Sequence, residues 1–444
     1  MAALAPAQID ADPGIADLIA ARPALSMHAM DGFLLEDVPL NAVADAVGTP
    51  CWVISAGTLR ARLAELQAAM AGVGAHVHYA VKANDHLAVL RVMQAGGAGA
   101  DVVSGGELLR ARKAGIAPER IVFSGVGKTV AELRLALEIG IAQLNVESAE
   151  ELDMLSAVAV AMRRTARVAL RINPDVDAGT HAKITTGRAD NKFGIAMADA
   201  AGLYARAAGL AGVEPVGLAV HIGSQIIAMA PYRAAYARAA GLVRSLRASG
   251  FAVHTLDCGG GLGIGYRDEP HGSPMALAGT IGAALGDLGL RLMVEPGRWL
   301  AGPAGLLLAS VVLTKTTGAR RFVVLDAAMN DLLRPSLYES WHGLVPLSPV
   351  DALAATTPAD VVGPVCETGD TFARARELAA LAAGARVAIL DAGAYGSVMS
   401  STYNARPLAA EVMVDGADWS VIRPRQPVEA LWANESVPEW LAAS

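Results

Sequence analysis

The sequence predicts an α/β protein with a second, mostly β domain, in which a (β/α)8 TIM barrel is followed by a C-terminal β-domain. Between about residues 76 and 298, short β-prone apolar runs alternate eight times with Ala/Leu-rich helical segments. After residue 298 the helical pattern largely stops. Eight strand-plus-helix units match a closed parallel barrel. A doubly wound sheet is the alternative, although it more often shows fewer units and a glycine-rich first turn.

The strand ends of this barrel carry polar residues. The eight predicted strands cover residues 76–83, 100–105, 121–125, 143–148, 168–174, 217–224, 255–261 and 292–298, with helices predicted at 107–114, 130–139, 149–162 and 231–249. Catalytic groups of a barrel lie at the carboxyl ends of its strands. Those ends carry Lys82, Ser104, Ser124, Asn145, Arg171, His221, Gly259, Gly260, Gly261 and Glu295. A polar segment, 175–193, is expected to form a long loop over the barrel mouth.

Three segments follow from this pattern. A leader, residues 1–48, is expected to join the β-domain partly, through a strand within 32–40. The barrel is assigned to residues 49–299 and the β-domain to 300–444. Strands separated by Gly, Pro and Asp turns are predicted in the latter at 309–314, 321–325, 360–365, 386–391 and 409–414.

Composition excludes several classes of protein. The chain has 444 residues, of which 53% are hydrophobic and 18% charged, and its net charge of −7 argues against a general nucleic-acid surface. Its three cysteines show no paired spacing, which favours a reducing compartment over a disulfide framework or a cysteine-rich zinc site. The sequence has neither a signal-peptide pattern nor a credible membrane span. We therefore expect a cytoplasmic protein with no membrane or nucleic-acid partner and no bound metal.

Lys82 closes the first predicted strand, in the run His78-Tyr79-Ala80-Val81-Lys82-Ala83-Asn84. A surface charge is the commoner role for a lone lysine. A desolvated lysine, however, is the usual protein group that holds an aldehyde cofactor covalently.

Three other strand ends carry chemistry that suits such a cofactor. Gly259, Gly260 and Gly261 could let the backbone approach a phosphate, or could simply form a tight turn. Glu295 could protonate a pyridine nitrogen or pair structurally with Arg298. His221 could stack on a planar ring or be an ordinary core histidine, and a metal ligand is the least favoured of its roles.

The predicted β-domain adds three polar motifs. Cys366 and Glu367 lie on a polar turn, where a thiol beside charged groups can donate a proton. Arg334 and Tyr338, four residues apart, could bind a substrate carboxylate. Tyr395 lies between small residues and could reach a phosphate. Each motif is weak alone, and Cys366 could equally be a small residue placed by chance.

In order and spacing these residues closely resemble the fold-type III pyridoxal-phosphate decarboxylases, and within that family the diaminopimelate decarboxylases. The resemblance runs from about residue 30 to 440. Its motifs are YAVKAN (79–84), DVVSGGEL (101–108), NVES (145–148), RINPDVDAGTH (171–181), NKFGI (191–195), HIGSQ (221–225), GGGLGI (259–264), EPGR (295–298), MNDLLRPSLY (329–338), GPVCETGD (363–370) and DAGAYG (391–396). Thr368 stands where serine is more usual in the family, and the segment before residue 25 matches no motif.

The resemblance implies an alanine-racemase-like barrel followed by a β-domain, with pyridoxal 5'-phosphate as cofactor. It implies that Lys82 binds the cofactor covalently, His221 stacks on its ring and Glu295 pairs with its ring nitrogen. The implied phosphate site comprises Ser224, Gly259, Gly260, Gly261, Pro296, Gly297, Arg298 and Tyr395. The implied substrate site comprises Arg298, Arg334, Tyr338, Glu367 and Tyr395. Cys366 would act in the site of the partner subunit of a homodimer.

The implied reaction is decarboxylation of meso-2,6-diaminopimelate to L-lysine and carbon dioxide, the last step of lysine biosynthesis. A sister decarboxylase with another amino-acid substrate and a catalytically dead homologue are the alternatives. Lys82 and Cys366, both present, count against a dead homologue. Glu367 after Cys366 counts against an ornithine or arginine decarboxylase, which typically has Asp there.

Overall fold

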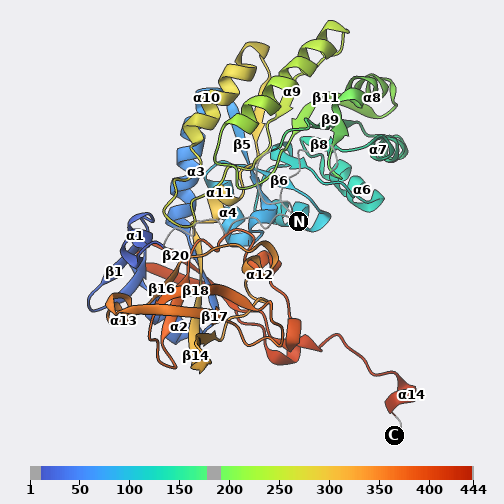
Figure 1. Ribbon diagram of the computed structural model, residues 1–444. Helices are drawn as coiled ribbons and strands as arrows, with labels where there is room; N and C mark the ends of the chain where they lie inside the picture. The colour runs from blue at the N-terminus through green and yellow to red at the C-terminus, as the bar shows by residue number, and fades with distance from the viewer. Residues whose placement is uncertain (1–11, 178–191, 443–444) are drawn as a thin grey trace, which may run out of the picture.

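The computed structural model describes residues 12–177 and 192–442, and within them eight parallel strands close into a barrel (Figure 1). These strands are β5 (Ala75–Ala80), β6 (Gly99–Val102), β7 (Ile121–Phe123), β8 (Gln143–Val146), β9 (Ala166–Asn173), β11 (Val213–Val220), β12 (Thr255–Asp257) and β13 (Arg291–Val294). Each pairs in parallel with the next, and β13 pairs with β5 to close the sheet. The predicted barrel is confirmed, and the doubly wound alternative is wrong.

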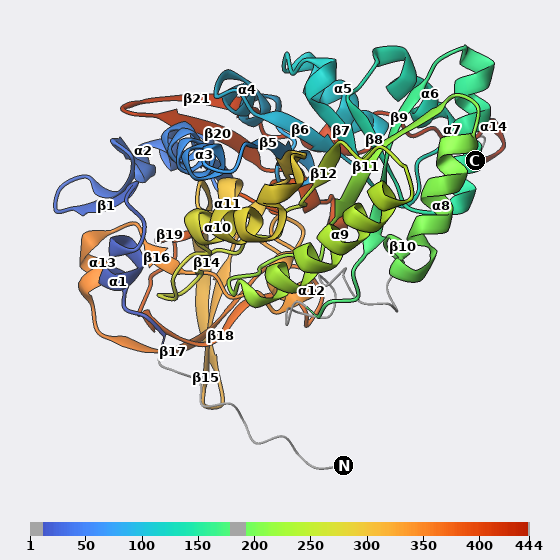
Figure 2. The ribbon, with the colours of Figure 1, turned by 90° about the horizontal axis from the view of Figure 1, so that it is seen from above.

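Helices surround these strands (Figures 1 and 2). They are α3 (Ala56–Ala71), α4 (Leu87–Ala95), α5 (Gly105–Lys113), α6 (Val130–Ile139), α7 (Ala149–Met162), α8 (Met197–Gly209), α9 (Ala230–Ala248) and α10 (Pro274–Leu285). Several begin at a serine or threonine whose hydroxyl accepts a hydrogen bond from the first turn, as Ser104, Thr129 and Ser148 do. These caps fix where each strand-to-helix loop ends.

A second sheet lies beside the barrel. It contains β4 (Cys51–Ser55), β14 (Gly305–Thr317), β15 (Arg320–Leu325), β17 (Thr356–Val362), β18 (Thr371–Ala379), β20 (Ala410–Asp415) and β21 (Asp418–Arg423), with β16 (Leu344–Pro346) paired to β19 (Arg386–Ile389). The expected β-domain is therefore present, with strands at all five of its predicted positions. β16, β18 and β21 were not predicted.

The N-terminal boundary of the barrel requires a correction. The segment 49–299 was assigned to the barrel, but β4 pairs with β14 and β20 in the second sheet. Side chains of β4 belong to three hydrophobic cores. Ile54 packs in the core of the barrel, Trp52 in the core of the second sheet, and Val53 in the core beneath the leader. The barrel's own elements begin with α3.

The leader forms a small sheet of its own rather than a strand of the larger one. Its strands are β1 (Leu25–His28), β2 (Gly32–Leu35) and β3 (Val38–Pro39), flanked by α1 (Ile15–Ala20) and α2 (Leu40–Val47). It is nevertheless attached to the β-domain, because the Phe33 N–H donates to the Leu347 carbonyl. The side chains of Phe33 and Leu35 pack with Leu306 and Val345 in one core.

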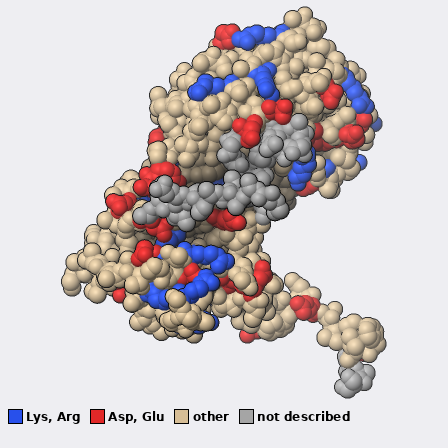
Figure 3. Space-filling model, viewed as in Figure 1, with Lys and Arg blue, Asp and Glu red and all other residues tan. Residues whose placement is uncertain are grey.

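Most of the loop expected at residues 175–193 lies outside the described residues, although β10 (Ile195–Ala196) beyond it pairs with β9. Among the helices that the structure describes, none is long and apolar enough to cross a membrane. On the face shown in Figure 3, basic and acidic side chains are interspersed over both domains.

Candidate active site

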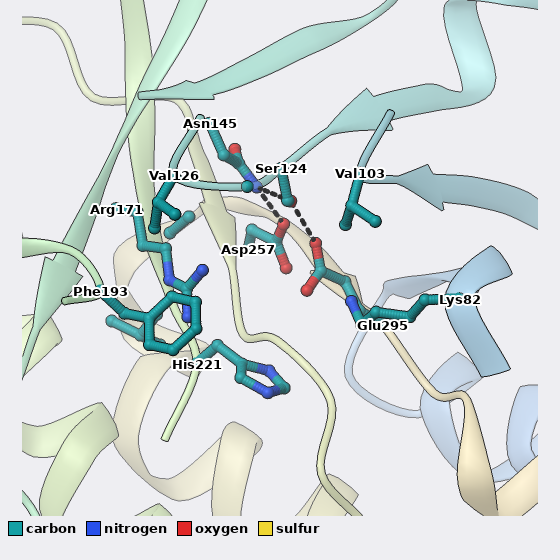
Figure 4. A pocket seen from close by; sticks show the side chains of 13 residues that line it. Lys82, Val103, Ser124, Val126, Asn145, Arg171, Phe193, His221, Asp257 and Glu295 are labelled. Carbon is teal, nitrogen blue, oxygen red and sulfur yellow. Dashed lines mark hydrogen bonds between the residues drawn. The ribbon is translucent and has the colours of Figure 1, made fainter. Parts of the chain in front are cut away.

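The carboxyl ends of the barrel strands surround a cavity of about 310 Å³ (Figure 4). Its lining comes from the ends of all eight strands and the loops that follow them. The lining residues are Lys82, Val103, Ser124, Gly125, Val126, Asn145, Arg171, Phe193, Ala219, Val220, His221, Asp257 and Glu295. The sequence thus predicted correctly that Lys82, His221 and Glu295 meet in one place.

Lys82 lies in a single turn of 3-10 helix, η1 (Val81–Ala83), directly after β5. Its Nζ donates to Asp101 Oδ2 at 2.8 Å, and one-third of the lysine side chain is exposed. Burial by itself lowers the pKa of Lys82, but the carboxylates of Asp101 and Glu295 outweigh it and leave that pKa raised. The lysine is therefore a charged group inside the cavity rather than a surface charge.

Asp101, on β6, is a site residue that sequence reasoning missed. Its side chain is fully buried, and its Oδ1 has no hydrogen-bond partner within the described part of the chain. The register places Asp101 opposite Ala80, two residues before Lys82. A lone Asp within an apolar strand is the available signal, since a buried carboxylate needs a cationic or hydrogen-bonding partner.

Two carboxyl groups, those of Asp257 and Glu295, lie together at the ends of β12 and β13 (Figure 4). Asn145 Nδ2 donates to Asp257 Oδ2 and to Ser124 Oγ, both at 3.0 Å, and Ser124 Oγ donates to Glu295 Oε1 at 3.4 Å. Burial, followed by the charges of Asp101 and Asp257, raises the pKa of Glu295 well above its usual value. A buried pair of this kind holds a proton between them. Asp257 was not predicted as a site residue.

His221 follows β11 and presents a neutral imidazole to the cavity. Its Nδ1 accepts a hydrogen bond from the Gly260 N–H at 3.2 Å, so the neutral ring carries its proton on Nε2. Burial, then the charges of Arg171 and Lys82, lowers the pKa of His221 well below its usual value. On the same side of the cavity, Arg171 donates to Glu147 Oε1 at 2.8 Å and lies 5.0 Å from the Phe193 ring centre (Figure 4).

The three consecutive glycines are required by close packing of backbone against backbone. A Cβ on Gly259, Gly260 or Gly261 would lie 2.2, 2.0 or 2.3 Å from a backbone carbonyl oxygen at the end of a neighbouring strand or in the loop after it. Two of their N–H groups are engaged: that of Gly259 donates to Asp257 Oδ1 and that of Gly260 to His221. The tight-turn interpretation therefore explains the glycines sterically, while their role toward a phosphate stays a prediction.

Arg298, Ser224 and Tyr395 lie next to one another at the N-terminus of α11 (Arg298–Ala301). Arg298 Nε and Nη2 both approach Ser224 Oγ at 3.3 Å, and its guanidinium lies 4.9 Å from the Tyr395 ring centre. The Tyr395 N–H donates to the Ala83 carbonyl at 2.8 Å, which joins this cluster to the lysine turn. A Cβ on Gly297 would lie 3.4 Å from the Tyr395 hydroxyl.

Arg334 begins α12 (Arg334–Tyr338) and is only 4% exposed. Its Nη1 lies 2.9 Å from His342 Nε2, its Nη2 donates to Ser340 Oγ at 3.2 Å, and Tyr338 is half-buried at the other end of the helix. Arg334 and Arg298 form no ion pair with a carboxylate anywhere in the described ranges. Two buried, unneutralised guanidiniums form a site for an anion.

Cys366 and Glu367 lie elsewhere. Both are exposed on the loop between β17 and β18, and neither lines the cavity of its own chain. Asp370 anchors this loop, because its carboxylate accepts hydrogen bonds from Met329 N at 2.7 Å and Val365 N at 2.8 Å. The loop therefore projects a thiol and a carboxylate outward from a fixed base.

The residues of this cavity fit pyridoxal 5'-phosphate. A cationic lysine beside a carboxylate oxygen that has no partner among the described residues suits a covalently bound aldehyde with polar ring substituents. The proton shared near Glu295 suits a ring nitrogen, and the flat face of His221 suits the ring itself. Arg298 and the adjoining loops supply a cation and backbone donors for a phosphate.

Comparisons with known proteins agree with this chemistry. Residues 56–302 match the family described as pyridoxal-dependent decarboxylase, pyridoxal binding domain. The diaminopimelate decarboxylase of Zymomonas mobilis is 50% identical over 412 residues, which cover 92% of this chain and 97% of that protein. The structure of the diaminopimelate decarboxylase from Helicobacter pylori complexed with L-lysine superposes with a TM-score of 0.86 at 39% identity, covering 89% of this chain and 99% of the other. The structure of the diaminopimelate decarboxylase from M. jannaschii superposes with a TM-score of 0.90 at 33% identity, covering 95% of this chain and 100% of the other. The chain therefore belongs to the diaminopimelate decarboxylase family of pyridoxal-dependent decarboxylases.

Proposed function

We propose that this protein is a carboxy-lyase that converts meso-2,6-diaminopimelate to L-lysine and carbon dioxide, with pyridoxal 5'-phosphate as cofactor. The observation that carries the choice of substrate is the pair of unneutralised buried guanidiniums, Arg298 and Arg334. Diaminopimelate has two carboxylates, so one remains to bind this pair while the other is lost as carbon dioxide. Ornithine, arginine and lysine have only the carboxylate that is lost. Relatives of 40–50% identity that bear the name diaminopimelate decarboxylase support the same choice.

The side chains of the cavity have distinct roles toward the cofactor. Pyridoxal 5'-phosphate, when bound, supplies an aldehyde for covalent attachment and a ring that accepts the electron pair left by departing carbon dioxide. Lys82 would provide the attachment point, with Asp101 holding its Nζ in place. Glu295 would keep a proton at the ring nitrogen, supported by Asp257. His221, fixed as the neutral tautomer, would pack against the ring.

The phosphate site would combine Arg298, Ser224, Tyr395 and the backbone of residues 259–261 and 296–297. Among the three glycines, this role falls mainly to Gly261. The N–H groups of Gly259 and Gly260 already bond to Asp257 and His221, whereas that of Gly261 has no such bond within the described residues. Arg298 adds the positive charge.

The substrate site would span two subunits of a homodimer. Arg298, Arg334 and Tyr338 would bind the distal carboxylate in the chain that carries Lys82. Glu367 of the second chain would bind the distal amine, and Cys366 of that chain would deliver a proton to the carbon that has lost its carboxylate. The exposed position of both residues supports this proposal, because neither of them lines the cavity of its own chain.

The decisive experiment measures carbon dioxide release by the purified protein from meso-diaminopimelate, L-ornithine, L-arginine and L-lysine in parallel. We expect turnover of diaminopimelate alone. Good turnover of another substrate without turnover of diaminopimelate would make the protein a sister decarboxylase. No turnover of any of them would indicate an inactive homologue.

Cofactor attachment has its own readout. Borohydride treatment should fix a pyridoxyl mass on the peptide that contains Lys82 and abolish the visible absorbance. Lys82→Ala should carry neither signal. Lys113→Ala, which removes an exposed lysine on α5, is the matched control and should retain both.

A further inference from the structure

Tyr266 lies between the two guanidiniums of the anion site. Its hydroxyl accepts a hydrogen bond from Arg298 Nη1 at 2.7 Å, and its ring centre lies 4.9 Å from the Arg334 guanidinium carbon. Only 8% of Tyr266 is exposed, and its backbone is held on both sides, with its N–H bonded to Glu269 and its carbonyl to Arg22. One fixed side chain thus contacts both cations.

His342 contacts the other side of Arg334. Its Nδ1 lies 2.7 Å from the Leu390 carbonyl oxygen, and because a carbonyl only accepts, the imidazole proton lies on Nδ1. The free electron pair on Nε2 then faces Arg334 Nη1 at 2.9 Å. The ring is 2% exposed and packs edge-on against Tyr266 at 5.3 Å between centres.

These contacts hold two like charges close together in a buried place, which costs free energy unless the surroundings compensate. The compensation comes from the Tyr266 hydroxyl on Arg298, the Tyr266 π-face on Arg334 and the His342 electron pair on Arg334. Arg334 Nε is left buried and without a hydrogen-bond partner within the described chain. That donor is available for an incoming carboxylate.

We propose that Tyr266 and His342 are positioning residues that set the enzyme's selectivity for a substrate with a distal carboxylate. Neither residue needs to touch the substrate. Each fixes the direction in which a guanidinium presents its donors, and bidentate recognition of a carboxylate depends on that direction. This inference rests on the function proposed above.

The test compares two ligands of the holoenzyme that differ only in this carboxylate, L-lysine and cadaverine. Affinities are measured by calorimetry. The wild-type protein should bind L-lysine more tightly than cadaverine. His342→Ala should lower the affinity for L-lysine about 10- to 100-fold and change the affinity for cadaverine about 3-fold or less. In turnover, the KM for diaminopimelate should rise more than kcat falls.

Two conservative substitutions separate positioning from packing. His342→Gln places an amide oxygen near the position of Nε2 and can still accept from Arg334. His342→Asn places an amide nitrogen near the position of Nδ1 and keeps only the bond to Leu390. Gln should therefore restore the preference for L-lysine and Asn should not. Equal rescue by both, or better rescue by Asn, would reduce His342 to a structural role and overturn the inference.

Tyr266→Phe tests the second residue, because it keeps the ring face and removes the bond to Arg298. We expect about a 10-fold loss of L-lysine affinity with cadaverine affinity unchanged. Tyr204→Phe is the matched control, since the hydroxyl of this buried residue on α8 donates to the backbone carbonyls of Pro215 and Ala252, away from the cavity lining. If wild type shows no preference for L-lysine, the proposed substrate is wrong. If wild type shows it and all variants keep it, only the positioning role is wrong.

Discussion

At the scale of single residues, charge compensation decides what Lys82 can do. Asp101, on the neighbouring strand β6, compensates the charge of Lys82. One of its carboxylate oxygens accepts a hydrogen bond from Lys82 Nζ, and the other has no partner in the described chain. The carboxyl pair of Asp257 and Glu295 contributes the opposite property, because burial and mutual repulsion raise the pKa of both groups and make the pair hold a proton more tightly. A cation and a retained proton within one cavity are what a pyridine aldehyde requires.

Glu295→Gln tests the second of these properties. The amide preserves the volume and a hydrogen bond but cannot hold a pyridine nitrogen in its protonated form. We expect kcat for diaminopimelate to fall about 10- to 100-fold, the size of a lost hydrogen bond to a charged group. Borohydride should still fix the cofactor on Lys82, as mass spectrometry of the peptide would show. Unchanged kcat would mean that Glu295 has only a structural role.

At the scale of elements, local patterns predicted most of the barrel. The predicted helices 130–139 and 149–162 coincide with α6 and α7, because capping residues and periodicity mark both ends of each. The predicted strands instead extend one to four residues too far at their carboxyl ends, for example to 83 where β5 ends at Ala80. The residues predicted as strand beyond these ends belong to the loops that follow the strands, and polar residues of these loops line the cavity.

Two errors in the strand assignment, at β18 and β4, have different causes. β18 has the sequence TFARARELA, whose Ala, Arg, Glu and Leu residues are good helix formers, and only pairing with β17 makes it a strand. Residues 51–55, which form β4, lie within the segment 49–299 that was assigned to the barrel. Its actual neighbours, β14 and β20, lie roughly 250 and 360 residues further along the chain, and local periodicity carries no information about such pairing. Asp101, Tyr266 and His342 escaped notice likewise, since their importance comes from contacts across the fold.

Glu107, in the first turn of α5, gives a pH dependence with a defined sign. Burial raises its pKa from 4.5 to about 7, although the carboxylate accepts a hydrogen bond from Val103 N. The folded state therefore binds this proton more tightly than the unfolded chain, and stability falls as pH rises from about 4.5 through 7. Glu107→Gln removes that loss. The unfolding free energy of the variant minus that of wild type should therefore increase by on the order of 2 kcal/mol when the pH is raised from 5 to 8.

Urea unfolding of the holoenzyme at both pH values measures this gain. Glu132→Gln on α6 is the matched control with the opposite sign. Hydrogen bonds from the Thr129 and Gly105 backbone lower the pKa of Glu132, so its contribution to stability is present at neutral pH and lost in acid. This second variant should lose stability at pH 8 relative to wild type. A gain in both variants would contradict the assigned cause.

At the scale of the whole molecule, β4 connects the barrel and the second sheet close to the active site. β4 contributes Trp52 to the core of the second sheet and Ile54 to that of the barrel. Trp52 also packs against Gly396, where a Cβ would lie 2.8 Å from its ring, next to Tyr395. Most of the groups proposed to bind the cofactor come from the barrel, whereas Tyr395, Arg334 and Tyr338 come from the β-domain. Contacts between the two domains therefore fix the distance between the two parts of the proposed site.

The same division leads to the last prediction, that active sites are shared between subunits. Lys82→Ala and Cys366→Ala should each be inactive alone, but mixed subunits should recover activity. A heterodimer with a shared site combines the intact Lys82 of one chain with the intact Cys366 of the other, which restores one of its two sites. Random equal mixing should therefore return about 25% of wild-type activity, because about half of the dimers are mixed.

The matched control mixes Lys82→Ala with Arg298→Ala, two changes on the same side of the interface. No mixed dimer then contains an intact site, and no activity should return. The two experiments distinguish a shared site from a site within one chain, because Cys366 would behave like Arg298 if it acted in its own chain. Mixed dimers confirmed by native mass spectrometry but without recovered activity would place Cys366 in the site of its own chain and contradict the shared site. The outward position of Cys366 on a loop anchored by Asp370 leads us to expect recovery.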